Sequence, residues 1–286
     1  MGAYLYEMRP KQWTKNLLVY AALLFGGSLF QEGAFLKTTV AFAAFCLTSS
    51  GVYFFNDIYD APQDRQNPAK CHRPIAAGEI GLRAAYLAAT VLFAMGLTLA
   101  AWVDNLCLGI IALYIVTNLA YTVRLKHLVI IDVMIVAMGF VLRAVVGVVA
   151  AGTGVTMWFL LCVMFLSLFL ALGKRRHELL SVENSPKMTG RKVLRFYSKG
   201  LIDQLMTIVT AALLICYALF TMDNATQNRE AMTLTIPLAL YGVFYYLYVV
   251  RVKRSGGSPD EALYKEKPIL AVVLLYVVAI VVIRNW

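Results

Sequence analysis

The sequence predicts an all-α integral membrane protein whose helices cross the bilayer nine times. Of its 286 residues, 60% are hydrophobic and 15% are charged, whereas about a quarter of the residues of a soluble domain are charged. Nine apolar runs are long enough, or nearly long enough, to cross a hydrocarbon core of about 30 Å. These runs cover residues 17–30, 38–55, 84–103, 106–122, 128–150, 155–173, 200–222, 231–250 and 269–283. We therefore expect a single polytopic membrane domain over residues 1–286.

The ends of the runs agree with membrane spans. The first run, 17–30, is short, and we expect Trp13 and Thr14 to extend it at its N-terminal end. Trp102, Trp158 and Trp286 stand near the ends of later runs, and amphipathic rings prefer the membrane interface. We therefore expect the bilayer, rather than water, to surround most of the chain.

The positive charges predict the orientation of the spans. The chain carries 26 Lys and Arg residues, and its formal net charge is +10. With the N-terminus inside, only Lys37, Arg229 and Arg284 fall on the outer side, and Arg143 lies within a span. Such a distribution follows the positive-inside rule. On a chain this apolar, the basic balance reflects orientation and attraction to anionic lipid or substrate, so we expect no nucleic-acid partner.

The connections between the runs differ in length on the two sides. The outer connections at 104–105 and 152–154 are short, whereas the inner connections 56–83, 174–199 and 251–267 are long and charged. Polar chemistry is therefore expected on the inner, cytoplasmic side.

An acidic stripe follows the second run, in FFNDIYDAPQDRQNPAKCHRP. On a helix, Asp57, Asp60 and Asp64 occupy positions i, i+3 and i+7 and point the same way. Three carboxylates on one stripe repel one another unless a cation lies among them, and hard oxygen ligands suit Mg²⁺ held against phosphates. The alternative is a solvated acidic helix end, but unpaired acids at a membrane boundary are costly and usually functional.

Cations near the same inner surface are candidate phosphate ligands. Lys70 and Arg73 follow the acidic stripe, and His72 between them is equally typical of a turn. Lys15 precedes the first span and Lys126 precedes the fifth. Each of these two lysines is as typical of a positive-inside anchor as of a phosphate ligand.

Two charges lie inside the fifth apolar run. Asp132 and Arg143 each cost about 2.5–3.5 kcal/mol on insertion scales. Because eleven residues are close to three helical turns, both share a face with Gly139 and Gly147 that should look into the bundle. We expect the two charges to line a cavity and to bind substrate, in preference to a structural ion pair. The glycines should let a neighbouring helix or lipid tail come close.

The segment NDIYDAPQD resembles the NDxxDxxxD motif of the UbiA-like membrane prenyltransferase superfamily. The resemblance implies nine transmembrane helices around a cytoplasm-facing cavity. It also implies that the first Asp-rich motif binds a diphosphate through Mg²⁺. The positions that match this motif are Asn56, Asp57, Asp60 and Asp64.

The chain departs from the aromatic-substrate members of the superfamily. Where they carry a second Asp-rich motif, it has GKRRHELLSVENSPKM. Together with RPKQWTKN, LKHLVIIDVMIVAMGFVLRAVVGVVAAG and GGSPDE, this segment resembles the decaprenyl-phosphate phosphoribosyltransferase branch. That branch implies Mg²⁺-dependent transfer of 5-phosphoribose from phosphoribosyl diphosphate (PRPP) to a polyprenyl (decaprenyl) phosphate, with release of diphosphate, at a bacterial plasma membrane.

A donor with three phosphate groups needs many cations, which the second charged inner segment supplies. Lys174, Arg175 and Arg176 stand where other members have acids. We expect Lys174 and Arg175 to contact phosphates and to act in catalysis with Asp57 and Asp60. Glu178 shares the helical face of Lys174 and is expected to hold that lysine or to touch the metal.

Two other functions remain as alternatives. An aromatic prenyltransferase shares the first motif, although the missing second Asp-rich motif counts against it. A transporter would use the charges within the spans as a permeation path, but the sequence shows no inverted repeat or broken helices in matching halves. The inner loop 251–267, with Asp260 and Glu261, either covers the donor or is a flexible connection. Membrane lipids are expected partners, and a homo-oligomer is left open.

Overall fold

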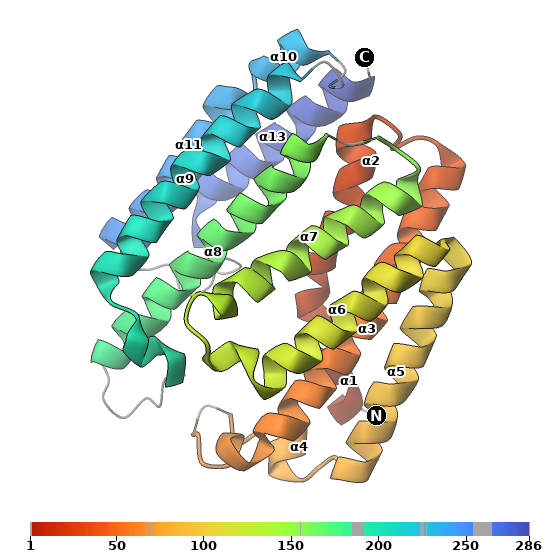
Figure 1. Cartoon of the computed structure of the whole chain (residues 1–286), viewed down its shortest axis with the longest axis vertical. Coiled ribbons are helices and arrows are strands. Elements are labelled where there is room, and N and C mark those ends of the chain that lie inside the picture. The colour runs from red at the N-terminus through yellow and green to blue at the C-terminus, as the bar shows by residue number, and fades with distance from the viewer. Residues whose placement is uncertain are drawn as a thin grey trace. The chain divides into compact units, whose positions relative to one another are not determined.

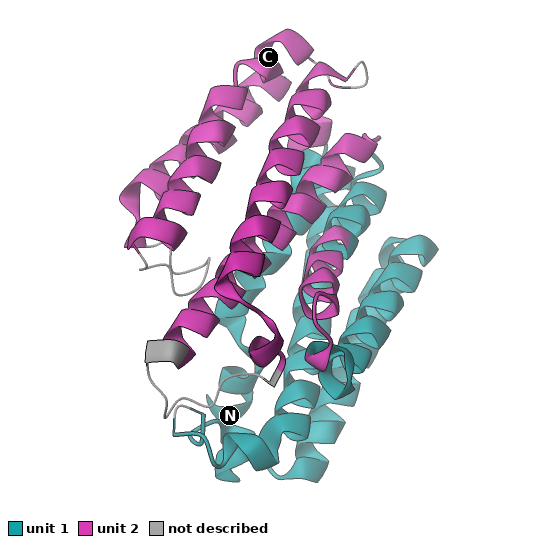
Figure 2. Ribbon diagram, turned by 60° about the vertical axis from the view of Figure 1, so that its left-hand side comes forward, with its two compact units in different colours: residues 1–23, 28–126, 142–153 teal, residues 24–27, 127–141, 154–286 magenta. Residues whose placement is uncertain are grey.

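The computed structural model describes residues 2–68, 70–154, 156–184, 192–223, 226, 228–253 and 265–285. Its regular elements over these ranges are helices, as predicted (Figure 1). Within the same ranges, eight helices are long and apolar enough to cross a membrane. The chain divides into two compact units (Figure 2), and α2 (Ala21–Gly26) and α7 (Ile131–Ala151) each contribute to both.

The first unit contains residues 1–23, 28–126 and 142–153. Its elements are α1 (Gly2–Met8), η1 (Pro10–Tyr20), α3 (Glu32–Asp64), α4 (Pro74–Ala77), α5 (Leu82–Val103) and α6 (Asn105–Val123), with parts of α2 and α7. The 33-residue α3 is central, because α1, η1, α4, α5 and α6 all pack against it. Val19, Phe45 and Ile111 are completely buried in the core of this unit.

Small residues allow the backbones of the first unit to come close together. A Cβ atom added to Gly96 on α5 would lie 2.3 Å from Thr48 Oγ1 on α3. A Cβ atom added to Gly147 on α7 would lie 2.1 Å from the Val19 carbonyl oxygen of η1. The close approach predicted for Gly147 is thereby confirmed, and its neighbour is the N-terminal segment.

The second unit contains residues 24–27, 127–141 and 154–286. Its elements are α8 (Met157–Asn184), η3 (Lys192–Phe196), α9 (Lys199–Met222), α10 (Arg229–Thr233), α11 (Ile236–Tyr248), the π-helical η4 (Val249–Lys253) and α13 (Lys267–Asn285). The short η2 (Leu125–His127) precedes α7. Helix α8 packs against α9, and α11 packs against α9 and α13. Phe169, Ile202 and Met206 are buried in the core of the second unit.

Local sequence accounts for several helix ends. The extended Asp104 accepts a 2.7 Å hydrogen bond from the Leu106 amide and so caps α6, while Ser198 caps α9 through a 3.1 Å bond from the Leu201 amide. Such side chains satisfy amides that have no partner within the helix. Gly152, with φ of 62°, follows the last residue of α7, as expected for a left-handed C-terminal position.

Two boundaries differ from the sequence prediction. The first predicted span, 17–30, lies largely in η1 and α2, neither of which is among the eight long helices. The predicted count of nine spans therefore stays a prediction. Helix α8 continues to Asn184. Lys174, Arg175 and Glu178 therefore lie on this helix, which agrees with the helical face expected for Lys174 and Glu178 but extends beyond the predicted span 155–173.

Candidate active site

Two carboxylates of the acidic stripe share one arginine. Arg73 Nη1 donates to Asp57 Oδ1 at 3.1 Å and to Asp64 Oδ2 at 2.7 Å. The two aspartates are two helical turns apart on α3, so the predicted common face is confirmed for this pair. Arg73 has an extended backbone and immediately precedes Pro74, the first residue of α4. Lys70 Nζ adds a second cation 3.7 Å from Asp64 Oδ1.

Arg9 provides another cation that sequence reasoning missed. Its guanidinium donates to Asp57 Oδ2 and lies 5.0 Å from the centroid of the Tyr53 ring. Arg9 precedes Pro10 and has a left-handed backbone, with φ of 53°, which is uncommon for a residue other than glycine. A charged residue directly before proline at a helix start was the available signal. Its partner is 48 positions away, which local sequence does not reveal.

Hydrogen bonds attach the N-terminal residues 8–16 to Ser49 and Ser50 of α3. Trp13 Nε1 donates to Ser50 Oγ at 3.1 Å, and Ser50 Oγ lies 2.9 Å from the Met8 carbonyl oxygen. Asn16 Nδ2 donates to Ser49 Oγ at 3.2 Å. These contacts hold the backbone on both sides of Arg9 against the helix that carries Asp57.

Glu7, at the end of α1 in the same N-terminal segment, was also missed by sequence reasoning. It is 1% exposed, and its Oε1 atom has no hydrogen-bond partner. Burial, followed by a hydrogen bond and charge repulsion from Asp57, raises the pKa of Glu7 from 4.5 to about 8. At neutral pH, the Glu7 carboxyl is therefore protonated and donates to Asp57.

The third member of the stripe has a different partner. Lys126 Nζ lies 2.6 Å from Asp60 Oδ1 and 5.1 Å from the centroid of the Tyr59 ring. The lysine side chain is 12% exposed and the aspartate side chain 22%. Asn56 Nδ2 donates to Asp57 Oδ1 at 3.3 Å, and its predicted role in substrate binding stays a prediction.

The donor chemistry of the stripe fits a hard metal ion. Asp57 Oδ1 and Asp64 Oδ2 face the same nitrogen of Arg73, so two carboxylate oxygens already approach one positively charged group. Carboxylate oxygens are the ligands that Mg²⁺ prefers. Within the described residues, however, no group of three His, Cys, Asp or Glu side chains is arranged to hold a metal. The predicted set of Asp57, Asp60 and Asp64 therefore stays a prediction.

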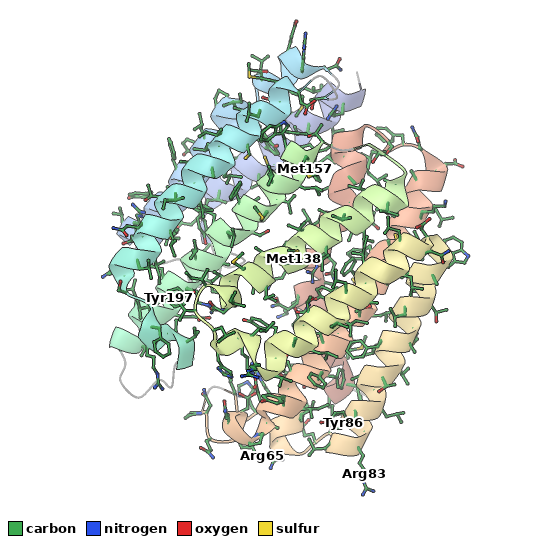
Figure 3. The ribbon with its side chains drawn as sticks, viewed as in Figure 1. Arg65, Arg83, Tyr86, Met138, Met157 and Tyr197 are labelled. Atoms are coloured by element: carbon green, nitrogen blue, oxygen red, sulfur yellow. The ribbon has the colours of Figure 1, made fainter. Side chains whose placement is uncertain are left out.

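A second polar group, in the other unit, surrounds the start of α7. Asp132 is 0% exposed. Its Oδ2 accepts from Arg175 Nε at 2.6 Å, and its Oδ1 accepts from the Tyr197 hydroxyl at 2.7 Å. Arg175 Nη1 also donates to Glu178 Oε2 at 2.5 Å. Tyr197 (Figure 3) accepts in turn from the Ile130 amide at 2.8 Å. Burial and the bond to Asp132 raise the pKa of Tyr197, so that its hydroxyl stays a donor.

This geometry corrects two predicted roles. Asp132 does not line an accessible cavity, because it is fully buried in an ion pair with Arg175. Arg175 is 4% exposed and contacts two carboxylates, so the described geometry does not support a direct phosphate contact. Glu178 binds Arg175 at position i+3, and its predicted contact with Lys174 or a metal stays a prediction. The prediction failed because a buried cation needs compensation by acids, and those acids come from α7 and from α8 itself.

Arg143 also has a structural environment, in the first unit. Its Nε donates to Asn16 Oδ1 at 2.7 Å, and its Nη2 donates to the Tyr114 hydroxyl at 2.9 Å. The guanidinium lies 5.3 Å from the centroid of the Phe45 ring, and the residue is 6% exposed. Arg143 therefore anchors η1 to the helices around it, and the predicted substrate-binding role is not supported.

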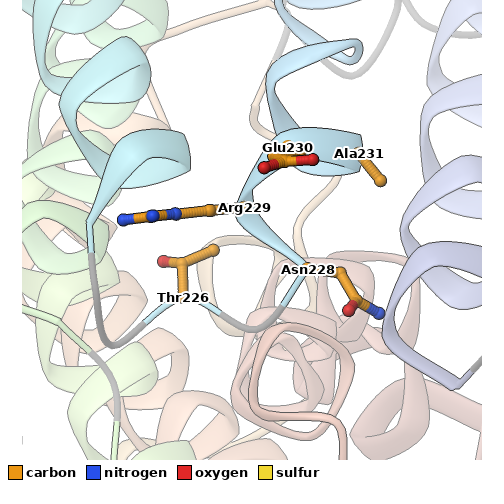
Figure 4. Close-up of a pocket in the computed structure, with 5 residues that line it drawn as sticks. All are labelled: Thr226, Asn228, Arg229, Glu230 and Ala231. Atoms are coloured by element: carbon orange, nitrogen blue, oxygen red, sulfur yellow. The ribbon is translucent and has the colours of Figure 1, made fainter.

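Two of the remaining predicted residues lie within the described part of the chain, and two lie outside it. Lys15 is half-buried in η1, and Lys174 is half-buried on α8. Asp260 and Glu261 lie outside the described residues. A separate pocket near α10 contains none of the predicted site residues (Figure 4). It is lined by Thr226, Asn228, Arg229, Glu230 and Ala231.

Comparison with known proteins places the chain in a family. The sequence model that describes the UbiA prenyltransferase family matches residues 17–265. The chain belongs to this family. UbiA family relatives that are 36% and 35% identical, from Corynebacterium glutamicum and Mycolicibacterium smegmatis, are both named decaprenyl-phosphate phosphoribosyltransferase. The alignments cover 96% and 94% of this chain and 84% and 88% of those proteins.

A solved UbiA homologue from Archaeoglobus fulgidus, bound to DMAPP and Mg²⁺, has the same fold. It superimposes with a TM-score of 0.75 at 20% sequence identity, over 98% of this chain and 99% of that chain. At this level of identity the likeness supports the predicted UbiA fold and assigns no residue role.

Proposed function

We propose that the protein transfers 5-phosphoribose from PRPP to the phosphate of a polyprenyl lipid, with release of diphosphate. The observation that carries this proposal is the 36% identity, over 96% of the chain, to a protein named decaprenyl-phosphate phosphoribosyltransferase. The cations around the acidic stripe support it, because a donor with three phosphate groups requires them.

Asp57, Asp60 and Asp64 are the proposed magnesium ligands, with Asn56 beside them. Their oxygen chemistry supports this role, as does the approach of two of their carboxylates to Arg73. When bound, Mg²⁺ supplies positive charge that stabilises the departing diphosphate. The carboxylates orient the diphosphate end of the donor, and Arg73 binds its outer oxygens.

The reaction is a displacement at the anomeric carbon of the ribose. An oxygen of the lipid phosphate forms a bond to that carbon, while the bond from the carbon to the diphosphate oxygen breaks. The lipid phosphate is already charged, so no strong general base is needed. The protein contributes positioning and charge stabilisation. Lys15, Lys126 and Lys174 are proposed phosphate ligands, whereas Asp132, Arg175 and Glu178 hold the start of α7 against α8.

The proposed location is a bacterial plasma membrane, with the N-terminus and the active site on the cytoplasmic side. The eight apolar helices support a multi-pass protein, and the uneven distribution of Lys and Arg supports the orientation. A cytoplasmic site gives access to PRPP, which is water-soluble, while the lipid acceptor enters from the bilayer. A homo-oligomer remains a proposal for solution measurements.

Transfer of label from radioactive PRPP into an organic-extractable lipid tests the function. Purified protein is incubated with decaprenyl phosphate and Mg²⁺, and parallel reactions contain EDTA or the Asp57→Asn variant. We expect label in the lipid phase of the complete reaction and at least a hundredfold less in both controls. A lack of lipid label together with prenylation of 4-hydroxybenzoate from a prenyl diphosphate would assign the protein to the aromatic branch.

A further inference from the structure

The charged side chains that pair with Asp57 and Asp64 are more exposed than these two carboxylates. The side chains of Asp57 and Asp64 are 2% and 5% exposed. Those of Arg9, Arg73 and Lys70 are 27%, 22% and 45% exposed. A ligand that approaches this group therefore meets three cations first, with the carboxylates beneath them. This arrangement attracts an anion.

Arg9 and Arg73 bind opposite oxygens of the same carboxylate. Arg9 donates to Asp57 Oδ2, and Arg73 donates to Asp57 Oδ1. Among the described residues, Arg73 keeps Asp64 as a second carboxylate partner, whereas Arg9 pairs with Asp57 alone. If Asp57 turns to a metal ion, Arg9 loses its carboxylate. Its planar fork of N–H donors then matches the oxygens of a phosphate group.

The backbone of Arg9 is held in an uncommon conformation. With φ of 53° and ψ of 60°, it is left-handed, and such residues persist only where their surroundings fix them. Ser50 supplies this restraint, because it accepts from Trp13 Nε1 and contacts the Met8 carbonyl oxygen. These two contacts lie on either side of Arg9 in the chain and direct its side chain towards Asp57.

We propose that Arg9 binds a phosphate group of the substrates, exchanging the Asp57 carboxylate for phosphate oxygens, and that the Trp13–Ser50 hydrogen bond positions it. This inference rests on the proposed function only for the identity of the substrates. The donor's diphosphate, its 5-phosphate and the lipid phosphate all offer the same chemistry. The diphosphate is the favoured source, because Asp57 belongs to the motif proposed to bind it.

The test measures binding without turnover. Calorimetric titrations with Mg²⁺ and inorganic diphosphate, ribose 5-phosphate or decaprenyl phosphate compare the parent with Arg9→Ala, Arg9→Lys and Trp13→Phe. Arg83→Ala is the matched control, because it removes the same charge from an exposed position at the start of α5 (Figure 3). Arg9→Lys keeps the charge but loses the fork, and it replaces Arg9→Ala if the alanine variant does not fold.

We expect Arg9→Ala to weaken diphosphate binding at least tenfold, and Arg9→Lys and Trp13→Phe to weaken it less, while Arg83→Ala leaves it unchanged. A loss confined to ribose 5-phosphate or to decaprenyl phosphate would assign Arg9 to that phosphate instead. Unchanged affinity for all three probes in folded Arg9 variants overturns the proposal. If the parent transfers no phosphoribose but Arg9→Ala weakens diphosphate binding, the proposed function fails and the role of Arg9 stands.

Discussion

The hydroxyl of Tyr197 donates a 2.7 Å hydrogen bond to the buried carboxylate of Asp132. The same hydroxyl accepts from the Ile130 amide. Ile130 has φ of 69°, and this left-handed conformation is an outlier for a β-branched residue. A single phenol thus holds both the backbone turn before α7 and the charge in its first turn.

Tyr197→Phe should destabilise the protein. The change leaves one oxygen of the fully buried Asp132 without this donor and removes the partner of the Ile130 amide, and losing a partner of a buried polar group costs about 1–3 kcal/mol. Thermal unfolding in detergent measures the effect. Tyr86→Phe is the control, because Tyr86 is 50% exposed (Figure 3). Equal midpoints for the two variants would contradict this reading of the Tyr197 hydroxyl.

Asp132 and Arg175 should show strong energetic coupling. Asp132→Leu leaves the Arg175 charge without its fully buried partner, and breaking a buried pair costs about 3–5 kcal/mol. Arg175→Met combined with Asp132→Leu removes both charges and should recover most of that loss. A double-mutant cycle on the free energy of unfolding measures the coupling. Simple additivity of the two single variants would refute it.

Gly147→Ala should be poorly tolerated, although alanine is the better helix former. The new methyl group would lie 2.1 Å from the Val19 carbonyl oxygen, and such overpacking costs about 1–3 kcal/mol. Gly109→Ala on α6 is the control, because a Cβ there meets no atom within 4 Å. We expect a lower midpoint for the first variant and an equal or higher midpoint for the second. The opposite order would mean that η1 and α7 are not in close contact.

The contribution of Glu7 to the stability of the parent should fall as the pH rises from about 4.5 to about 8. Glu7 has its pKa raised to about 8 in the folded protein, against 4.5 as the ordinary value. In this window the unfolded chain loses a proton that the folded protein keeps, so rising pH favours unfolding.

Glu7→Gln removes this dependence. In EDTA, the melting temperature of the variant minus that of the parent should increase steadily between pH 5 and pH 8 and stay constant above pH 8. Glu32→Gln, at an exposed position in the first turn of α3, is the charge-matched control. Parallel curves for the parent and Glu7→Gln would show that Glu7 ionises normally in the folded protein.

The fold class and the Asp57–Asp64 face could be predicted because both depend on short-range pattern. Long apolar runs indicate membrane-spanning segments, and a spacing of seven residues places two side chains on one helical face. The partners could not be predicted in the same way. Arg9 and Asp57 are 48 positions apart, and tertiary packing alone brings them together.

The interpretation of Arg175 shows a second limit. In the sequence it stands in a basic run, which favoured a phosphate ligand. In the structure its charge is compensated by Asp132 from α7 and by Glu178 one turn later on α8. Tyr197 completes this group from a segment that looked like a charged loop. The charges of these residues can be read from the sequence, but their burial cannot. Whether a charged side chain is buried decides whether it forms an internal ion pair or remains accessible to a ligand.

The pairing of Asp57 with both Arg9 and Arg73 has a practical consequence for handling the protein. Its most buried motif carboxylate already has two counter-ions within the chain, so the fold does not need a divalent ion to offset that charge. Chelator-treated protein should therefore stay folded and monodisperse. Metal removal and metal return then become a reversible way to stop and start the reaction in one preparation, without refolding between the two states.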